Sequence, residues 1–337
     1  MNKPQFYKTY LSYKKDKEKL FKLGIEKGYR YLISILLNDI DPSANDNYAI
    51  RMASEKGYTK IVRLLLQDQR INPSALNNSA IYWANIKGHT KTVKLLLQDS
   101  RVDPSMNDNK AIRMASEKGH TEIVKLLLED KRIDPSADDN FAIRYASEKG
   151  HTETVKLLLE DKRVDPSAEN NHAIRNTSYY GHTEIVKLLL EDKRVDPSAD
   201  DNYAIRWASK RGHTSIVKLL LKDKLVDPSA KNNYAIRYSS YRGHTEIVSL
   251  LLEDKRIDPS AGVNFAIRYA SLEGHTEIVK LLLKDPRVNP SANDNQAILM
   301  ASEYGVTEIV KLLLQDSRVD RWGETPTISQ LHNTYGK

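Results

Sequence analysis

The sequence is dominated by a repeat of 31 residues. The tripeptide Asp-Pro-Ser, with Asn in place of Asp in two copies, recurs nine times in constant register. Its prolines are Pro42, Pro73, Pro104, Pro135, Pro166, Pro197, Pro228, Pro259 and Pro290. A period of about 20 to 50 residues is typical of solenoids and propellers, in which each unit buries its apolar face only against its neighbours. The repeat therefore restricts the chain to an array of stacked units.

Each repeat is predicted to form two helices joined by a tight turn. In the fourth copy, residues 141–149 form the first predicted helix, with Asn140 as its N-cap and Gly150 as a left-handed residue at its end. The second helix follows Thr152, an N-cap hydroxyl, and its apolar residues recur at i, i+3 and i+4. A turn at Pro166 then separates this unit from the next, because proline cannot continue the preceding helix.

The second half of the repeat resembles the ankyrin repeat. The motif Gly-His-Thr-Glu-Ile-Val-Lys-Leu-Leu-Leu is complete at residues 119–128 and again at 181–190. The resemblance covers about residues 20–320. It implies an all-α ankyrin-type α-solenoid of stacked helix-turn-helix repeats, elongated and curved, whose first helices line a concave groove that binds partners.

The chain departs from the ankyrin pattern in two ways. The family's Thr-Pro-Leu-His opening is replaced by Ala-Ile-Arg, as at residues 204–206, and the period is 31 instead of about 33. The missing residues should come from the loop between repeats, where the family has a β-hairpin, so the shorter loop is open to another conformation. This Asp-Pro-Ser variant looks like those of ankyrin proteins in giant DNA viruses that infect amoebae.

The two ends differ from the repeat. We divide the chain into a basic N-terminal segment (1–19), a degenerate capping repeat (20–42), nine ankyrin-like repeats (43–320) and a short C-terminal cap or tail (321–337). The capping repeat is two residues shorter than the others before Asp41. At the other end Asp320 keeps the register, but Arg321 replaces the proline.

Composition narrows the class of protein. Cysteine is absent, which excludes disulfides, cysteine nucleophiles and thiolate metal sites. The N-terminus lacks the apolar core of a signal peptide, and no apolar run has the length of a membrane span. We therefore expect an intracellular protein of the (host) cytoplasm that is not secreted.

The positive charge of the chain is concentrated at its start. The net charge is +7, and residues 1–32 hold nine Lys/Arg against three Asp/Glu, so the remaining residues carry only +1. A basic end on a nearly neutral array is not the continuous stripe that follows nucleic-acid phosphates. We do not expect the array to bind nucleic acid.

Comparing the nine copies separates packing positions from variable ones. Ala49, Ile50, Ala53 and their equivalents hardly change and lie on one side of the first helix. The equivalents of Tyr48 and Met52 vary and lie on the opposite side. Aromatic and arginine residues, the usual anchors of protein interfaces, concentrate there in the middle and later copies. Around Met52 the alternative is that the side chains are partly buried filler.

We predict a binding patch for a peptide or protein on these variable positions. Its predicted residues are Phe141, Tyr145, His172, Tyr179, Tyr180, Tyr203, Trp207, Arg211, Tyr234, Tyr238, Tyr241, Arg242, Phe265 and Tyr269.

Seven of the nine histidines recur at one motif position. They are His89, His120, His151, His182, His213, His244 and His275. Successive copies should lie roughly 8–10 Å apart, whereas zinc ligands must all lie within about 2.1 Å of one ion, so the row cannot chelate a metal. We predict that each ring bonds to backbone at the turn.

Arginine forms two further rows, at the equivalents of Arg51 and of Arg70, and the equivalents of Asp68 are invariant among the copies. We predict charge pairing and loop capping between adjacent units, worth about 0–1 kcal/mol for each exposed pair. For the Arg51 row the alternative is a grip on an acidic partner, because this row borders the variable face.

The sequence carries no catalytic set. It has no glycine-rich phosphate loop, nucleophile elbow or His-Glu-x-x-His motif, and its carboxylates recur with the repeat instead of converging. We expect a monomeric, non-enzymatic protein with a protein partner, no cofactor, no metal and no membrane.

The leading function is therefore a scaffold that binds a protein or peptide partner. The resemblance to viral ankyrin proteins implies an adaptor for host proteins. The tail of residues 321–337 looks too short for the F-box-like segment of viral relatives. One alternative is a structural spacer. Another is contact with an anionic surface or nucleic acid through the N-terminal lysines Lys14, Lys15, Lys17, Lys19 and Lys22. The simpler interpretation of these lysines is that they lie on the solvated side of a capping helix.

Overall fold

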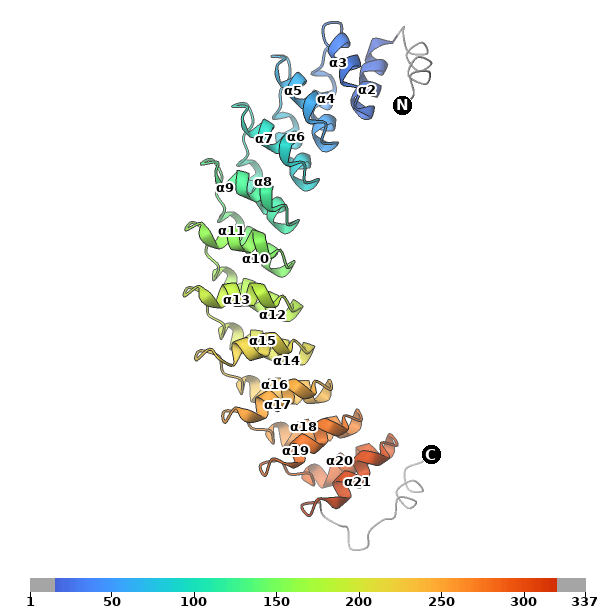
Figure 1. The fold of residues 1–337 in the computed structure, drawn as a ribbon, viewed down its shortest axis with the longest axis vertical. Helices are drawn as coiled ribbons and strands as arrows, with labels where there is room; N and C mark the ends of the chain where they lie inside the picture. Colours follow the sequence, from blue (N-terminus) through green and yellow to red (C-terminus); the bar gives the residue numbers. More distant parts are fainter. Residues whose placement is uncertain (1–15, 320–337) are drawn as a thin grey trace. The chain divides into compact units, whose positions relative to one another are not determined.

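The computed structural model describes residues 16–319 of the chain. These residues form twenty helices and no strands. The chain divides into two compact units, residues 1–168 and 169–337, and each is a stack of helix-turn-helix repeats (Figure 1). The predicted all-α architecture of stacked helix-turn-helix repeats is confirmed.

The first unit begins with the capping pair and continues with four repeats. Its helices are α2 (Lys17–Lys27), α3 (Arg30–Leu36), α4 (Ala44–Glu55), α5 (Thr59–Leu66), α6 (Ala75–Ile86), α7 (Thr90–Leu97), α8 (Met106–Glu117), α9 (Thr121–Leu128), α10 (Ala137–Glu148) and α11 (Thr152–Glu160).

The second unit contains five repeats. Its helices are α12 (Ala168–Tyr180), α13 (Thr183–Glu191), α14 (Ala199–Arg211), α15 (Thr214–Leu220), α16 (Ala230–Tyr241), α17 (Thr245–Glu253), α18 (Ala261–Leu272), α19 (Thr276–Leu283), α20 (Ala292–Glu303) and α21 (Thr307–Gln315). Among residues 16–319 no helix is long and apolar enough to cross a membrane.

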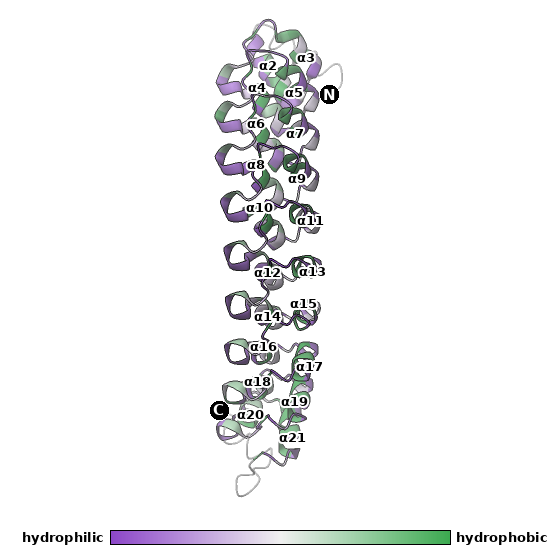
Figure 2. Ribbon diagram, turned by 90° about the vertical axis from the view of Figure 1, so that its left-hand side faces the viewer, coloured by the Kyte–Doolittle hydropathy of each residue, from purple (hydrophilic) through white to green (hydrophobic). Residues whose placement is uncertain are grey.

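Within each unit the helices form two layers. First helices such as α14, α16 and α18 pack on one another, and second helices such as α15 and α17 do the same (Figure 2). The core lies between the layers because each helix has one apolar side: Ile143 of α10 and Val155 and Leu158 of α11 are fully buried. The predicted C-terminal tail (321–337) and all but the last four residues of the predicted N-terminal segment (1–19) lie outside the described residues.

The loop between repeats contains a turn of left-handed backbone. Before the right-handed part of α10, Asp138, Asp139 and Asn140 have φ values of 55°, 51° and 61°. Asn and Asp tolerate this region better than other non-glycine residues, and they dominate these positions throughout. No strand occurs among the described residues, so this turn stands where a β-hairpin would.

The predicted N-caps of both helices are wrong. The side-chain oxygen of Asn140 accepts the backbone N–H of Asp165 in the next repeat at 2.7 Å, and Asn140 itself has left-handed φ. Without this acceptor, the N–H of a loop packed between two repeats would be left unpaired. Thr152 is the first residue of α11, with His151 as the cap residue and no side-chain capping bond.

The turn predicted at each Asp-Pro-Ser is confirmed. The Asp165 carboxylate accepts hydrogen bonds from the backbone N–H of Ser167 at 2.9 Å and from its hydroxyl at 2.6 Å. The proline between them, Pro166, is buried. An aspartate that bonds the backbone two residues later closes the turn locally, so the tripeptide repeats as one structural piece.

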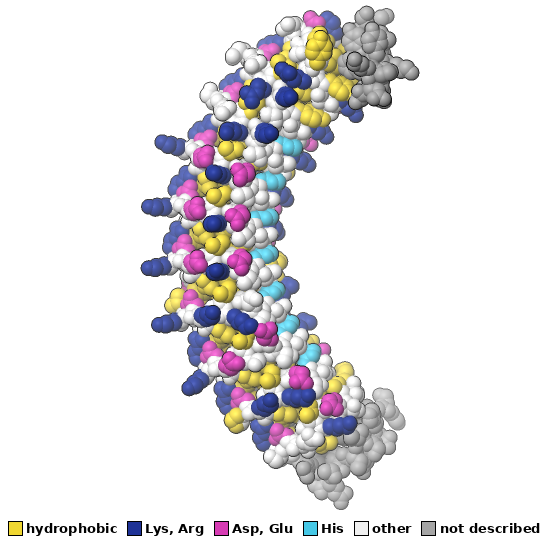
Figure 3. Space-filling model, viewed as in Figure 1, with side chains coloured by type: hydrophobic (Ala, Val, Ile, Leu, Met, Phe, Trp, Pro, Cys, Tyr) yellow, Lys and Arg dark blue, Asp and Glu magenta, His cyan; other side chains and the backbone are white. Residues whose placement is uncertain are grey.

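The histidine row bonds to backbone, as predicted. The Nε2 atoms of six motif histidines lie 2.8–3.0 Å from carbonyl oxygens of the preceding repeat; the residues are His89, His120, His151, His213, His244 and His275. Because a carbonyl only accepts, Nε2 carries the proton and donates. Figure 3 shows the histidines (cyan) in a row within each unit. No cluster of three or more metal-ligating side chains occurs in residues 16–319.

The Arg70 row joins successive repeats by capping carbonyls of the preceding repeat, as predicted, whereas its charge pairs lie within one repeat and not between adjacent units. Arg163 pairs with Asp161 at 2.6 Å, and its Nη1 donates to the Ile133 carbonyl of the preceding repeat at 2.8 Å. Hydrogen bonding from Arg163 lowers the pKa of the Asp161 carboxyl. The exception is Leu225, which replaces the arginine and is 62% exposed.

Candidate functional site

Twelve of the fourteen predicted patch residues lie in the second unit. The other two, Phe141 and Tyr145, belong to α10 of the first unit, where their rings stack with centroids 4.0 Å apart. In the second unit the rings of α12, α14, α16 and α18 contact one another in an unbroken series, which we name the aromatic face. It consists of Tyr179, Tyr180, Tyr203, Trp207, Tyr234, Tyr238, Tyr241, Phe265 and Tyr269.

Two kinds of ring contact build the aromatic face. Rings four residues apart on one helix stack, as Tyr234 and Tyr238 do with centroids 4.1 Å apart. Rings on neighbouring first helices meet at an angle: Trp207 lies 6.1 Å from Tyr234, and Tyr238 lies 5.5 Å from Phe265. Such pairs contribute about 0.5–1.5 kcal/mol beyond the area that they bury.

Most of these rings are half-buried. The one largely exposed ring of the aromatic face is Tyr180, at 51%. Trp207 contacts Tyr179, Tyr203 and Tyr234, so packing accounts for part of its surface. Burial raises the pKa of the Tyr203 phenol, which therefore stays protonated at neutral pH. The residues that we predict to bind a partner thus also pack against one another, and the binding role of the patch stays a prediction.

His172 also contributes to packing within its own helix. The side-chain amide of Asn176 donates to its Nε2 at 3.0 Å, one turn further along α12. His172 is half-buried.

Cations cover the rings of the aromatic face. The Lys210 ammonium lies 4.4 Å from the centre of the Trp207 ring, and the guanidinium carbon of Arg211 lies 3.9 Å from that of Tyr179. Arg242 covers Tyr241 at 5.2 Å. Each such contact is worth about 0.5–1 kcal/mol at an exposed site.

In the first unit, three of the four repeats have a glutamate followed by a lysine at the corresponding positions. Glu148 and Lys149 pair at 3.0 Å at the end of α10. At the same two positions the second unit has Lys210 with Arg211, and Tyr241 with Arg242. The acid has been replaced by a base or an aromatic ring, so these cations rest on rings instead of carboxylates.

The prediction omitted three residues that belong to this surface: Arg206, Lys210 and Arg237. Arg206 lies 5.5 Å from the Tyr234 ring, and Arg237 lies 5.3 Å from the Phe265 ring. The signal for Lys210 was available, because it is the one basic residue among the equivalents of Glu55. The two arginines belong to the nearly invariant Arg51 row, for which the sequence offered a grip on an acidic partner only as the alternative to charge pairing and loop capping.

The Arg51 row caps the left-handed turns. Arg206 donates from Nε to the Asp201 carbonyl at 2.8 Å and from Nη2 to the Asp200 carbonyl at 2.9 Å. The predicted loop capping is confirmed, although the capped loop belongs to the arginine's own repeat. Charge pairing with the next repeat is present for Arg175, whose Nη1 lies 3.2 Å from the Asp200 carboxylate.

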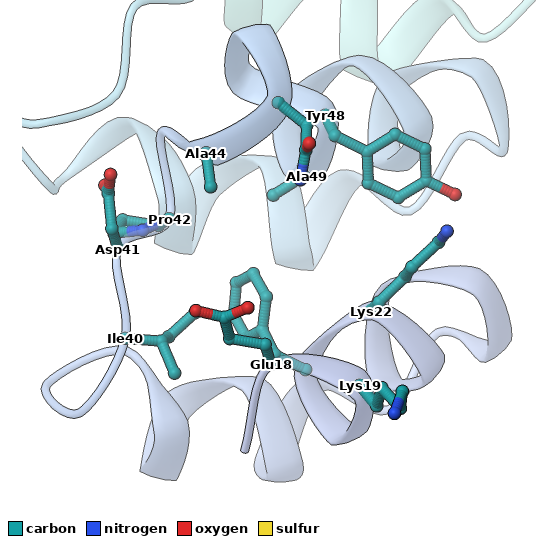
Figure 4. Close-up of a pocket in the computed structure, with 11 residues that line it drawn as sticks. Glu18, Lys19, Lys22, Ile40, Asp41, Pro42, Ala44, Tyr48 and Ala49 are labelled. Atoms are coloured by element: carbon teal, nitrogen blue, oxygen red, sulfur yellow. The ribbon is translucent and has the colours of Figure 1, made fainter. Parts of the chain in front are cut away.

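A cavity of about 400 Å³ lies beside α2 in the capping repeat (Figure 4). Phe21, Pro42 and Tyr48 form much of its lining. Counting back from the glycine that ends each first helix, Glu18 stands where later repeats have the buried asparagine. Because α2 starts directly after Asp16, with no left-handed turn, the space that this turn fills elsewhere is open here.

The described basic residues near the N-terminus have local partners. Lys17 pairs with Asp39 at 2.9 Å, and Lys19 pairs with Asp16 at 2.8 Å. Lys22 lies 5.4 Å from the centre of the Tyr48 ring. These contacts favour a solvated capping helix over an anion-binding segment. Lys14 and Lys15 lie outside the described residues.

Comparison with protein families gives one match that covers most of the chain. The family model described as ankyrin repeats (3 copies) matches residues 22–108, 100–170, 171–264 and 267–329. A search of curated proteins found no match.

Proposed function

The chain belongs to the ankyrin-repeat family, and from this premise we propose that it is a binding scaffold whose second unit captures a protein partner on the aromatic face. Ankyrin repeats generally mediate protein–protein interaction and are typically non-enzymatic. The resemblance of the Asp-Pro-Ser repeat to those of giant-virus ankyrin proteins extends this proposal to an adaptor that binds host proteins.

The observation that carries this proposal is the exchange of acid–base pairs for rings and cations. A scaffold position such as Glu148 is satisfied by its neighbour Lys149. Tyr241 and Arg242 at the same positions add aromatic surface and a guanidinium, which are the residue types most enriched in energetically dominant interface positions. Stacking of the repeats does not require this exchange, because the first unit stacks without it.

The proposal is tested by partner capture with a triple variant, Tyr203→Ala, Trp207→Ala and Tyr234→Ala. The immobilised full chain and the variant are incubated with cell lysate, and retained proteins are identified by mass spectrometry. We expect the variant to lose the partners that the parent chain retains. Because the rings are half-buried, each substitution should also cost about 1–2 kcal/mol, so thermal unfolding followed by circular dichroism must show a folded variant.

The matched control is Tyr82→Ala with Trp83→Ala in the first unit. These rings are also half-buried and in edge contact, with centroids 5.2 Å apart. Their removal should leave capture intact. A folded triple variant that captures the same partners as the parent chain contradicts the proposal.

A further inference from the structure

Four of the seven arginines of the Arg51 row lack an acid 25 positions later: Arg51, Arg206, Arg237 and Arg268. Of these, Arg51 lies in the first unit, and Arg268 donates from Nη1 to the side-chain oxygen of Gln296. In Arg113 and Arg175 the Nη1 atom contacts the carboxylate of the residue 25 positions later, Asp138 and Asp200 respectively. Each of these guanidinium groups is thus shared between its own turn and an anion from the next repeat. The row is therefore both a turn cap and a charge pair.

At Arg206 and Arg237 the acid is absent from the sequence. The residues 25 positions later are Lys231 and Gly262. Both arginines still donate from Nε and Nη2 to the carbonyls of their own turn. Their Nη1 donors thus have no carboxylate at the position where Asp138 and Asp200 provide one.

The carboxylates on α14 are already engaged. Asp200 accepts from Arg175, and Asp201 pairs with Lys231 at 2.7 Å. Helix α16 carries no Asp or Glu. Around Arg206 and Arg237 the surface therefore has an excess of cations, to which Lys210, Arg211 and Arg242 add.

The arrangement fits carboxylates carried by an extended chain. Guanidinium groups bind carboxylates with paired, directional hydrogen bonds. First helices in neighbouring repeats lie roughly 8–10 Å apart. An extended peptide advances about 3.3 Å per residue, so an acidic residue at every third position meets one repeat after another.

The same surface is poorly suited to nucleic-acid bases. Sequence-tolerant binding of single strands depends on open aromatic faces for base stacking. Here the faces are covered, since Tyr234 stacks on Tyr238 and Lys210 lies over Trp207. The cations remain able to bind anions, while the rings offer mainly their edges.

We propose that Arg206 and Arg237, with Lys210 and the tyrosines around them, bind an acidic extended segment of the partner protein through its Asp and Glu side chains. This assignment rests on the proposed function and specifies the chemistry of the partner. It gives a role to Arg206 and Arg237, which are present although the acid 25 positions later is not.

The test measures peptide binding by the full chain with fluorescence anisotropy. The probe is a fluorescein-labelled peptide of five Glu-Leu-Ser triplets, compared with its Gln-Leu-Ser counterpart and with a labelled oligothymidine of 15 nucleotides. We expect the Glu peptide to bind at least about tenfold more tightly than the Gln peptide at physiological salt. Equal binding of the two peptides, or tighter binding of the oligonucleotide, overturns the proposal.

Two variants locate the binding. Arg206→Gln with Arg237→Gln should weaken Glu-peptide binding at least about fivefold. The matched control, Arg113→Gln with Arg144→Gln, removes the same kind of carbonyl contacts in the first unit, from arginines that have an acid 25 positions later, and should leave binding unchanged. Equal weakening by both double variants would assign the effect to structure and refute the proposal.

A third variant adds an acid without removing an arginine. Lys231→Asp restores the carboxylate that Asp138 and Asp200 provide in other repeats, and it should also weaken Glu-peptide binding. If the Glu peptide does not displace a captured partner, and the Arg206→Gln and Arg237→Gln double variant still captures it, this assignment is refuted and the proposed function stands. If the parent chain captures no protein at all, the proposed function itself is refuted.

Discussion

The Arg70-type arginines are the residues that most directly connect one repeat with the next. Arg256 pairs with Asp254 at 2.7 Å and donates from Nη1 to the Val226 carbonyl, 30 residues earlier, at 2.7 Å. At Leu225 only the backbone part of this arrangement is present, because its N–H donates to the Asp223 carboxylate at 2.9 Å. The leucine side chain lies largely in solvent.

Leu225→Arg should restore the missing connection. By analogy with Arg256, the new guanidinium would pair with Asp223 and donate to the Val195 carbonyl, 30 residues earlier. We expect a gain of about 0.5–1.5 kcal/mol in the free energy of unfolding, measured by urea denaturation. Leu225→Lys serves as the control, because it adds a positive charge without the planar guanidinium group that donates several hydrogen bonds at once. An equal gain from lysine would show that the connection is not the cause.

At the scale of the elements, the turn between two helices of one repeat depends on the histidine of the next. Gly119 ends α8 with φ of 69°, and a Cβ built there would lie 2.5 Å from Nδ1 of His151. The same ring donates from Nε2 to the Glu117 carbonyl at 2.9 Å. Glycine is therefore required both for its conformation and for the close approach of the ring.

Gly119→Ala should destabilise the chain by two effects, and Gly305→Ala by only one. At Gly305 φ is 71°, but nothing lies within 4 Å of the added Cβ. We expect about 1 kcal/mol of unfolding free energy to be lost at Gly305, and at least about 2 kcal/mol at Gly119, where the histidine must also move. Thermal and urea unfolding measure both. Equal losses would mean that the ring adjusts without cost.

At the scale of the whole molecule, the Asp–Arg pairs make stability depend on pH. Hydrogen bonding from the arginine two residues later lowers the pKa of eight carboxyls below the ordinary value of 3.8; they are Asp68, Asp99, Asp130, Asp161, Asp192, Asp254, Asp285 and Asp316. A carboxyl with a lower pKa in the folded chain stabilises it fully above the unfolded pKa. This contribution is lost as pH falls through the folded pKa.

The melting temperature should therefore be nearly constant with respect to these groups above about pH 5 and should fall steeply below about pH 4. Asp254→Asn with Asp285→Asn should lower stability at neutral pH and make the acid-induced fall shallower, because fewer protons are taken up on unfolding. Thermal unfolding followed by circular dichroism between pH 2 and 7 measures both. An unchanged slope in the double variant would show that these pairs do not govern acid unfolding.

The sequence alone determined the helices, the glycine turns, the apolar core and the roles of the histidine and Arg70 rows. It could do so because nine copies place the same residue in the same environment, so that invariance among copies marks packing. It also indicated most of the residues of the aromatic face, although it could not show which of them touch.

Only the tertiary structure decided the left-handed turns, the bond from Asn140 to the next repeat and the cations that rest on rings. It also showed that the residue 25 positions later contacts the guanidinium, as Asp200 contacts that of Arg175, whereas Arg206 and Arg237 have Lys231 and Gly262 at this position. These features depend on contacts between neighbouring repeats. The spacing of apolar residues along the sequence predicts which face of one helix is buried. A hydrogen bond between two repeats depends on how those repeats stack on each other.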